Sequence, residues 1–357
     1  MNTEFYTHNE YFASANGYGG FKSYFDKIFA SRDFERIFVL KGGPGTGKSS
    51  FIKKIAALSY ENGLGHELFR CSSDPNSLDG IIIEEKGKRV AVLDGTAPHE
   101  RDAEVPGAVD TIINLGAAWK QDALKSKRDS VLKLIERKNG HYKRAYEYLK
   151  YSSVFATNIK AEISNHMDKN ECTKKCNELA DIFYDGTHGK VKTRLVSSFS
   201  KFGYKTLTDT LNTFDKSFSV FGRYGSDALF IGLMRMRLEE LGAEICKIPS
   251  PLDPGSDEGI ILPNKNTLLF GMGSGKIICD TLEFLKIKNL RDFENLMQRL
   301  ENGKEYYLNL AAEELSLASD AHFELESIYT PLMDFSVVEE FFSSAAEEIK
   351  NIYRHDV

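Results

Sequence analysis

The stretch "RIFVLKGGPGTGKSSFIKKIAAL", residues 36–58, decides the fold that we expect of this chain. Its first run, "RIFVL", predicts a buried strand, and its last run, "SFIKKIAAL", predicts an amphipathic helix. Between them, Gly42, Gly47, Lys48 and Ser49 have the spacing of the motif GxxxxGK[ST]. Because a strand before this motif and a helix after it are the context that it requires, we expect a loop that binds phosphate groups.

Each residue type in this loop suits phosphate chemistry. Glycines let backbone N–H groups turn toward an anion, and the N-terminus of the following helix adds positive potential. Lys48 is predicted to reach the β and γ phosphates, and the Ser49 hydroxyl to ligate Mg²⁺. We therefore expect ATP and Mg²⁺ as ligands. The residues predicted to bind the nucleotide are Gly42, Gly43, Pro44, Gly45, Thr46, Gly47, Lys48, Ser49 and Ser50.

A second motif, "RVAVLDG" at residues 89–95, predicts a buried strand that ends at Asp94. A carboxylate in this place would hold Mg²⁺ beside Ser49, directly or through water. The next residue is Gly95, where many ATPase motors carry the glutamate that polarises the attacking water. The chain also lacks the guanine-binding motif NKxD, since "NKNT" at 264–267 has no aspartate, and this favours ATP over GTP.

Three other residues are candidates for the missing catalytic base: His99, Asp74 and Asp79. They follow neighbouring predicted strands, whose carboxyl ends converge on one crevice in a doubly wound sheet. Asp74 has an alternative role, because it precedes Pro75 and suits a turn. The alternative for Asp79 and His99 is a purely structural role.

The chain contains an internal repeat. A shift of 179 positions aligns residues 51–83 with 230–262 without a gap, and about ten of the 33 positions are identical. The counterpart of the phosphate-binding loop is then "FSVFGRYGSDALF" at 218–230, in which Asp227 stands opposite Lys48. An aspartate would repel phosphate, so we expect one competent site and one degenerate copy, although the glycines of the second copy leave weak binding of another anion open.

A third glycine-rich segment, "FGMGSGKIICD" at residues 270–280, resembles a phosphate-binding loop but lacks its first glycine and its hydroxyl residue. In the repeat alignment it falls opposite residues 92–100 instead of the loop at 42–49. We therefore predict that it is a different part of the repeat and binds no nucleotide.

These patterns predict an α/β fold made by tandem duplication, with a parallel sheet flanked by helices in each copy. We expect an active domain at residues 1–182, which includes a helical hairpin at about 115–180 broken by "NG" at 139–140. A degenerate repeat with C-terminal helices is expected at 183–357. At 357 residues, the chain has the length of two ordinary domains.

Residues 120–150 of the predicted hairpin hold ten Lys or Arg against four Asp or Glu, although the whole chain has a net charge of −6. The hairpin is either a solvated surface or a lid that contacts a polyanion. The residues of interest are Lys125, Lys127, Arg128, Arg137 and Arg144.

Composition bears on location and on other ligands. No apolar run approaches the roughly 18 residues of a membrane span, and the first twenty residues lack the pattern of a secretory signal. Five irregularly spaced cysteines argue against a disulfide framework, so we expect a cytoplasmic protein without membrane contact. Cys172 and Cys176 lie four apart on a predicted helix, but two further zinc ligands are missing, which favours a structural role.

The motifs "GGPGTGKSS" and "VAVLDG" resemble the P-loop NTPase superfamily. Together with "FASANGYGGF", "CSSDPNSLDG", "DGTAPH" and "PGAVDTIINLG", they resemble a little-characterised Firmicute family of duplicated P-loop ATPases, described as ATPases or nucleotide-kinase-like proteins. The resemblance covers almost the whole chain. It implies ATP binding and a two-copy architecture, and it supplies no substrate.

Three functions remain open on the residues alone. The first is a switch or slow Mg-dependent ATPase, in which the bound nucleotide orders neighbouring loops. The second is a phosphotransferase, in which Asp74 or Asp79 would accept a proton from a substrate hydroxyl. The third is an adaptor that binds ATP without turning it over.

Overall fold

The computed structural model describes residues 8–354 of an α/β protein with two compact units. Of the described residues, the first unit takes 8–15, 23–144 and 313–354. The second unit takes residues 16–22 and 145–312. Two short strands, β2 (Ser14–Gly17) and β3 (Gly20–Ser23), lie where the chain passes between the two.

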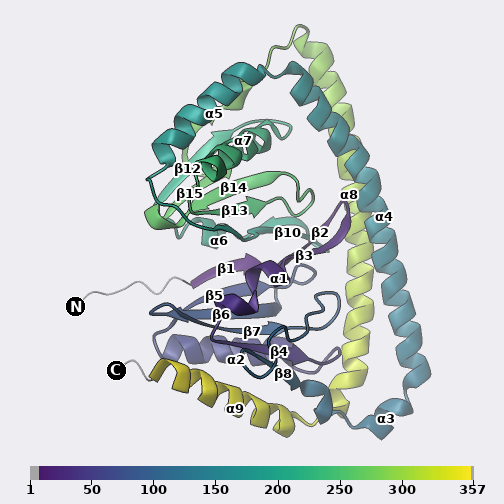
Figure 1. Ribbon diagram of the computed structural model, residues 1–357. Coiled ribbons are helices and arrows are strands. Elements are labelled where there is room, and N and C mark those ends of the chain that lie inside the picture. The colour runs from purple at the N-terminus through teal and green to yellow at the C-terminus, as the bar shows by residue number, and fades with distance from the viewer. Residues whose placement is uncertain (1–7, 355–357) are drawn as a thin grey trace. The chain divides into compact units, whose positions relative to one another are not determined.

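The first unit is built on a six-stranded sheet with the order β1-β5-β6-β7-β4-β8 (Figure 1). Strand β4 (Arg36–Lys41), which precedes the glycine-rich loop, lies parallel to β7 (Lys88–Asp94) on one side and to β8 (Asp110–Asn114) on the other. The remaining strands are β1 (His8–Phe12), β5 (Gly65–Arg70) and β6 (Leu78–Glu85).

The sheet is mixed, and the prediction of a parallel sheet is wrong at β6. This strand is antiparallel to both β5 and β7. Only residues 71–77 join β5 to β6, which is too short for the helical crossover that a parallel pair needs. Lys86 and Gly87, with φ of 49° and 79°, form the tight turn between β6 and β7, and positive φ at both central residues is typical of a hairpin turn.

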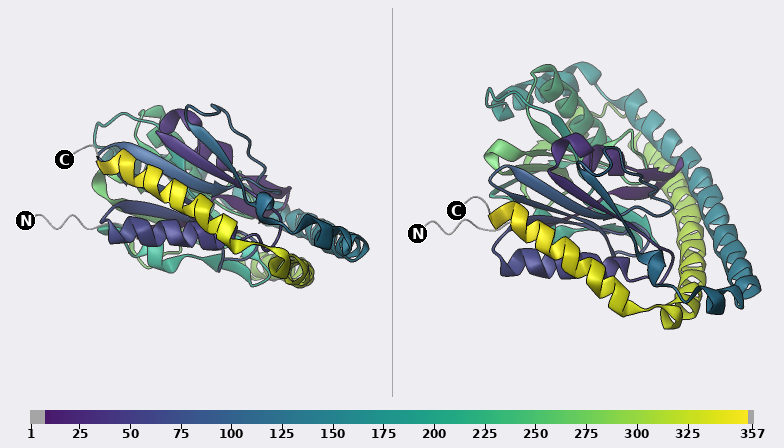
Figure 2. Two further views of the ribbon diagram at one scale, coloured as in Figure 1. Left: turned by 90° about the horizontal axis from the view of Figure 1, so that it is seen from below. Right: turned by 60° about the horizontal axis from the view of Figure 1, so that its bottom comes forward.

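Helices α2 (Lys48–Glu61) and α9 (Phe335–Arg354) pack on the same side of this sheet, next to each other (Figure 2). The buried side chains of α2, which include Phe51 and Ile55, lie in one apolar cluster with Val338, Ile349 and the strand residues. Packing of this kind supplies most of the stability of such helices. Shorter helices of this unit are α1 (Phe25–Ile28) and α3 (Gln121–Lys125), with 3-10 turns at Ser31–Asp33, Leu115–Ala118 and Thr330–Leu332.

The second unit repeats the topology of the first. Its sheet has the order β9-β13-β14-β15-β12-β16, with the same parallel and antiparallel pairs at corresponding positions. This is the arrangement that a tandem duplication produces. The strands are β9 (Val191–Thr193), β12 (Lys216–Phe221), β13 (Ile245–Pro249), β14 (Asp257–Leu262), β15 (Thr267–Gly271) and β16 (Lys276–Asp280).

The remaining elements of the second unit complete its core and its surface. Helix α7 (Ser226–Glu240) corresponds to α2, and the side chains of Phe230 and Met234 are fully buried. It packs with α5 (Lys169–Phe183) in the apolar cluster of this unit. A hairpin of β10 (Ser197–Ser200) and β11 (Gly203–Thr206) precedes α6 (Thr208–Leu211), and 3-10 turns lie at Pro263–Lys265 and Thr281–Phe284.

The compact units therefore do not divide at the predicted boundary between residues 182 and 183. Helix α9 follows the second sheet in sequence but packs on the first, and α5 follows the first sheet in sequence but packs on the second. A self-alignment identifies the copies of a repeat, but it contains no information on which sheet a terminal helix covers.

Two long helices, α4 (Arg128–His166) and α8 (Leu290–Tyr329), each contribute residues to both units. The predicted break at residues 139–140 is absent, because α4 continues through it, and the chain turns instead between α4 and α5 at Met167–Asp168. Helix α8 also contains an "NG" pair, and there the ring of Phe155 lies so close that a Cβ on Gly303 would be 2.3 Å from it. Glycine at this position permits close approach of two helices. On α4, a Cβ on Gly140 would meet only the end of the Arg144 side chain, at 3.7 Å.

Within residues 8–354, no helix combines the length and the apolar character needed to cross a membrane.

Candidate functional site

The glycine-rich loop joins the end of β4 to the start of α2, as predicted. Gly45 and Gly47 have φ of 69° and 85°, a region that other residue types rarely adopt. The hydroxyl of Thr46 donates to the carbonyl of Gly43 at 2.9 Å, which fixes the turn. Lys48 folds back over the loop, and its Nζ donates to the carbonyls of Gly42 and Gly43 at 2.9 and 3.0 Å.

The carboxylate of Asp94 lies beside this lysine, with Oδ2 3.7 Å from Nζ of Lys48. Asp94 is the last residue of β7 and pairs with Leu40 of β4, two residues before the loop begins. This pairing brings the carboxylate to the loop. The backbone N–H of Thr96 donates to Oδ1 at 2.8 Å. Burial raises the pKa of Asp94, and the charge of Lys48 opposes this. A metal ion would supply the positive charge that favours the ionised carboxylate.

Ser49, the predicted magnesium ligand of the loop, occupies the first turn of α2. Its Oγ accepts a hydrogen bond from the backbone N–H of Leu78 at 3.0 Å. An accepting hydroxyl retains a second lone pair, so this contact orients the oxygen without preventing it from binding a cation.

Asp79 and His99 are brought together, and both side chains are almost fully buried, at 7% and 6% exposure. Nε2 of His99 lies 3.2 Å from Oδ2 of Asp79, and its ring stacks on Phe25 with 4.9 Å between centroids. Burial lowers the pKa of His99, but the charges of Asp79 and Asp94 together raise it above the ordinary value. Asp94 and Lys48 both act on this histidine, so the pair belongs to the same site as the loop.

Asp74 has a different role from these two residues. Its Oδ1 accepts from the backbone N–H of Asn76 at 3.3 Å, and its carbonyl accepts from the N–H of Ser77 at 2.9 Å. Asp253 makes the matching contacts in the second copy, from the N–H groups of Gly255 and Ser256. Since the same turn occurs in a copy without the site, the turn interpretation of Asp74 agrees with the structure.

Three residues that are distant from the loop in sequence, Trp119, Glu326 and Thr330, lie close to it. No local sequence pattern indicates any of them. A Cβ on Gly45 would lie 2.5 Å from Oγ1 of Thr330, and one on Gly43 would lie 3.2 Å from the ring of Trp119. His322 holds the pKa of Glu326 below its usual range, and the backbone N–H of Gly45 and the charge of Lys48 add to this effect. The carboxylate of Glu326 therefore interacts with the Gly45 N–H group and the Lys48 charge, both of which the sequence predicts to face a phosphate.

The corresponding loop of the second copy is shorter. Six residues, Gly42–Gly47, separate β4 from α2, whereas four, Gly222–Gly225, separate β12 from α7. Both helices begin after a glycine in the left-handed region, but α7 begins one residue earlier relative to its buried face. Phe51 and Ile55 of α2 match Phe230 and Met234 of α7 at the 179-residue shift, so Asp227 stands opposite Lys48, as predicted.

Asp227 itself lies in the first turn of α7. Burial raises the pKa of its carboxyl, while hydrogen bonds from the backbone N–H groups of Asp227 and Ala228 lower it. A Cβ on Gly271 would lie 2.4 Å from its Oδ2, and by strand register Gly271 stands where the first copy has Asp94. Neither the lysine nor the metal carboxylate has a counterpart at these positions, in agreement with a degenerate copy.

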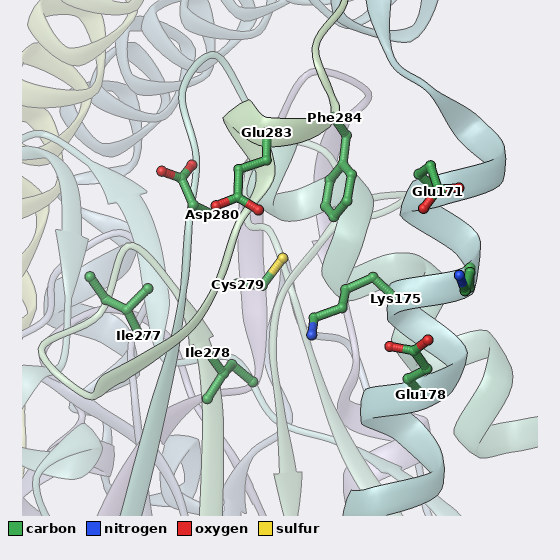
Figure 3. A pocket seen from close by; sticks show the side chains of 10 residues that line it. Glu171, Lys175, Glu178, Ile277, Ile278, Cys279, Asp280, Glu283 and Phe284 are labelled. Atoms are coloured by element: carbon green, nitrogen blue, oxygen red, sulfur yellow. The ribbon is translucent and has the colours of Figure 1, made fainter.

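The segment at residues 270–280 is not a phosphate-binding loop. It forms the end of β15, a short turn and β16, and no helix follows the turn. A cavity of about 460 Å³ in this unit is bordered by β16, α5 and the turn after β16 (Figure 3). Its charged lining comprises Glu171, Lys174, Lys175, Glu178, Asp280 and Glu283, and none of these belongs to the predicted site.

The charges of the predicted basic segment are partly matched by acidic residues. Arg137 pairs with Glu324, and Arg144 pairs with Glu314 at 3.0 Å, both on α8. Lys125 pairs with Asp122, three residues earlier, at 2.8 Å, and Arg128 pairs with its neighbour Asp129 at 3.0 Å; the two basic side chains are 74% and 73% exposed. This pattern agrees with the solvated-surface alternative for the segment.

Cys172 and Cys176 are buried in the core of the second unit, as their structural role requires.

Comparison with family models, with curated proteins and with solved structures gives no match to this chain.

Proposed function

We propose that the first unit binds Mg-ATP at residues 42–50 and hydrolyses it slowly, as a nucleotide-dependent switch. The observation that carries the proposal is the position of Lys48, which rests on the loop carbonyls with Asp94 3.7 Å away. In this arrangement the lysine is ready to exchange carbonyl oxygens for phosphate oxygens. Asp94 and Ser49 supply the oxygen ligands that Mg²⁺ prefers.

Slow turnover follows from Gly95. A Cβ at this position would lie 2.4 Å from Cγ1 of Val39, so no glutamate fits where many ATPase motors carry one. The buried pair of Asp79 and His99 is the group placed to act on the attacking water instead. This pair is close enough to the loop for His99 to be affected by the charges of both Asp94 and Lys48.

A switch is favoured by the contact between the loop and α8. Glu326 is held by His322 and by the N–H of Gly45, in the field of Lys48. A triphosphate requires the same N–H and the same lysine, and its negative charge would repel this carboxylate. Binding of ATP would therefore displace the end of α8, which carries the change along a helix that belongs to both units.

A phosphotransferase is the second candidate. Asp79 is a buried carboxylate at the start of β6, close enough to Asp94 to raise its pKa, and such a group can accept the proton of a substrate hydroxyl. A kinase would produce ADP rapidly only with its acceptor present, whereas a switch needs none.

The proposal is tested by measuring Mg-ATP binding and phosphate release with the full chain. Lys48→Ala and Asp94→Asn are expected to reduce both at least tenfold, because the phosphate charge and the metal lose their partners. Lys53→Ala, on the exposed side of the same helix, is the matched control and should behave as the wild type. Equal ATP affinity in all four proteins would refute the proposal, and strong stimulation by a metabolite that becomes phosphorylated would favour the kinase.

A further inference from the structure

Three side chains with metal-binding atoms converge beside the proposed nucleotide site. The sulfur of Cys71, a carboxylate oxygen of Asp79 and a ring nitrogen of His99 all lie within 4.8 Å of one another. Cys71 follows the end of β5, Asp79 lies in β6 and His99 lies in the segment after β7, so the sheet positions all three. Thiolate, carboxylate and imidazole are the three ligand types that zinc uses most in proteins.

The distances fit a tetrahedral ion. Bonds of about 2.0 Å from zinc to nitrogen and to oxygen, at the tetrahedral angle, place the two ligand atoms about 3.3 Å apart. Nε2 of His99 and Oδ2 of Asp79 are 3.2 Å apart. The sulfur of Cys71 lies within 4.8 Å of both atoms and would have to move toward them to complete the set.

A second observation also points to a missing ligand. Asp79 is only 5% exposed, and its Oδ2 has the ring nitrogen of His99 beside it at 3.2 Å but no well-aligned hydrogen-bond donor among residues 8–354. A buried carboxylate oxygen without a well-aligned donor is costly, and a cation held between the carboxylate and the imidazole would satisfy both groups.

The second copy provides an internal comparison. The 179-residue shift places Ser250 opposite Cys71 and Glu258 opposite Asp79, so the sulfur ligand is lost there together with the nucleotide-binding lysine. The three-ligand set is thus specific to the unit that carries the proposed nucleotide site.

We propose that Cys71, Asp79 and His99 bind a zinc ion, distinct from the Mg²⁺ expected at Ser49 and Asp94. The mixed sulfur, nitrogen and oxygen set selects a borderline-soft transition-metal ion over Mg²⁺, which prefers oxygen ligands alone. Three protein ligands leave the fourth tetrahedral position open for a water or a phosphate oxygen, as in zinc sites that take part in a reaction. The site requires no nucleotide, so it stands even if ATP does not bind.

The test uses the full chain, stripped of metal by a chelator and assayed without nucleotide. Zinc content after re-addition and gel filtration should be one ion per chain, and an excess of Mg²⁺ should not displace it. Cobalt(II) has an absorption spectrum that depends on its ligands, so in place of zinc it should give an ultraviolet thiolate-to-cobalt charge-transfer band. Cys71→Ser should abolish the band and weaken zinc binding by more than about 100-fold, beyond the 10–100-fold loss typical of an outer-shell partner.

Asp79→Asn provides a second variant of nearly the same shape, and it should also weaken zinc binding. Cys246→Ser is the matched control, because this cysteine is buried in the second unit, and it should retain the band. Circular dichroism of each variant separates loss of a ligand from loss of fold. The proposal is overturned if folded Cys71→Ser retains the band, if the band instead depends on Cys172, or if the wild type binds no stoichiometric zinc.

Discussion

Glu258→Gln should stabilise the second unit, and the gain should grow with pH. Glu258 lies in β14, at the position that Asp79 holds in the first copy. Burial raises the pKa of its carboxyl to about 8, and the hydroxyl of Ser197 opposes this only in part. Neither carboxylate oxygen has a hydrogen-bond partner of good geometry among the residues that the structure describes. The folded protein therefore holds a neutral glutamic acid at this position near neutral pH.

The magnitude follows from linkage between protonation and folding. The folded pKa lies above the ordinary value of 4.5, so the folded state binds this proton more tightly than the unfolded state. The stability is therefore fully present below pH 4.5 and is lost as the pH rises toward 8. The loss amounts to about 1 kcal/mol at pH 5 and about 3 kcal/mol at pH 7, because a tenfold difference in proton affinity corresponds to about 1.4 kcal/mol.

Hydrogen exchange of peptides from β13 and β14 is the suitable assay. The only tryptophan, Trp119, belongs to the first unit, so its fluorescence does not report on the second. After correction for intrinsic exchange at each pH, the ratio of variant to wild-type protection should rise by roughly 30- to 70-fold between pH 5 and pH 7. Glutamine adds a buried amide whose cost does not depend on pH, so the change between the two pH values is the test.

Glu240→Gln serves as the control, because this carboxylate is 65% exposed on α7. It should show no change in the protection ratio between the two pH values. A ratio for Glu258→Gln that is constant or falls as the pH rises would refute the reasoning, since Glu258 would then be charged in the folded state.

The remaining predictions concern the helices and the second copy. Gly303→Ala should destabilise the second unit by about 1–3 kcal/mol, because the new methyl group meets the ring of Phe155. Gly140→Ala should stabilise the first unit by up to about 1 kcal/mol, because alanine favours the helix. Thermal unfolding of the two variants measures both effects. Calorimetry should find one ATP per chain, and Asp227→Lys should leave that number unchanged; a second binding event would mean that the second copy is competent. Arg137→Glu should reduce ATP-dependent protection of residues 128–144 from hydrogen exchange, because it repels Glu324, while ATP affinity stays unchanged; equal protection would exclude a role for this pair.

Much of the chain can be predicted because local patterns and repeats carry strong signals. The strand, loop and helix at residues 36–58 and the strand that ends at Asp94 follow from hydrophobic runs and glycine spacing, and the structure has them in place. The duplication is visible because about ten of 33 aligned positions have remained identical. The direction of β6 is harder to predict because strand periodicity is the same in both orientations, and only the short connection of residues 71–77 distinguishes them.

The rest depends on contacts between residues far apart in sequence. The placement of Glu326 and Thr330 at the loop has no local pattern, since both lie in a helical segment that reads as an ordinary surface. The break expected at residues 139–140 is absent because packing outweighs the roughly 1 kcal/mol cost of glycine in a helix. Cys71 has no signal of its own in the sequence, because a lone cysteine indicates nothing until folding brings Asp79 and His99 to it.

Helix α9 packs on the first sheet and α5 packs on the second, so the first unit is completed only late in synthesis. The sheet that carries the glycine-rich loop is translated before residue 120, but the helix that covers it is translated only after the whole second sheet. At 5–20 residues per second, translation from Arg144 to Arg354 takes about 10–40 s. During that interval, the apolar surface under α9 has no cover from its own chain. The nascent protein therefore depends on Phe335–Arg354 to cover the sheet that residues before 120 form.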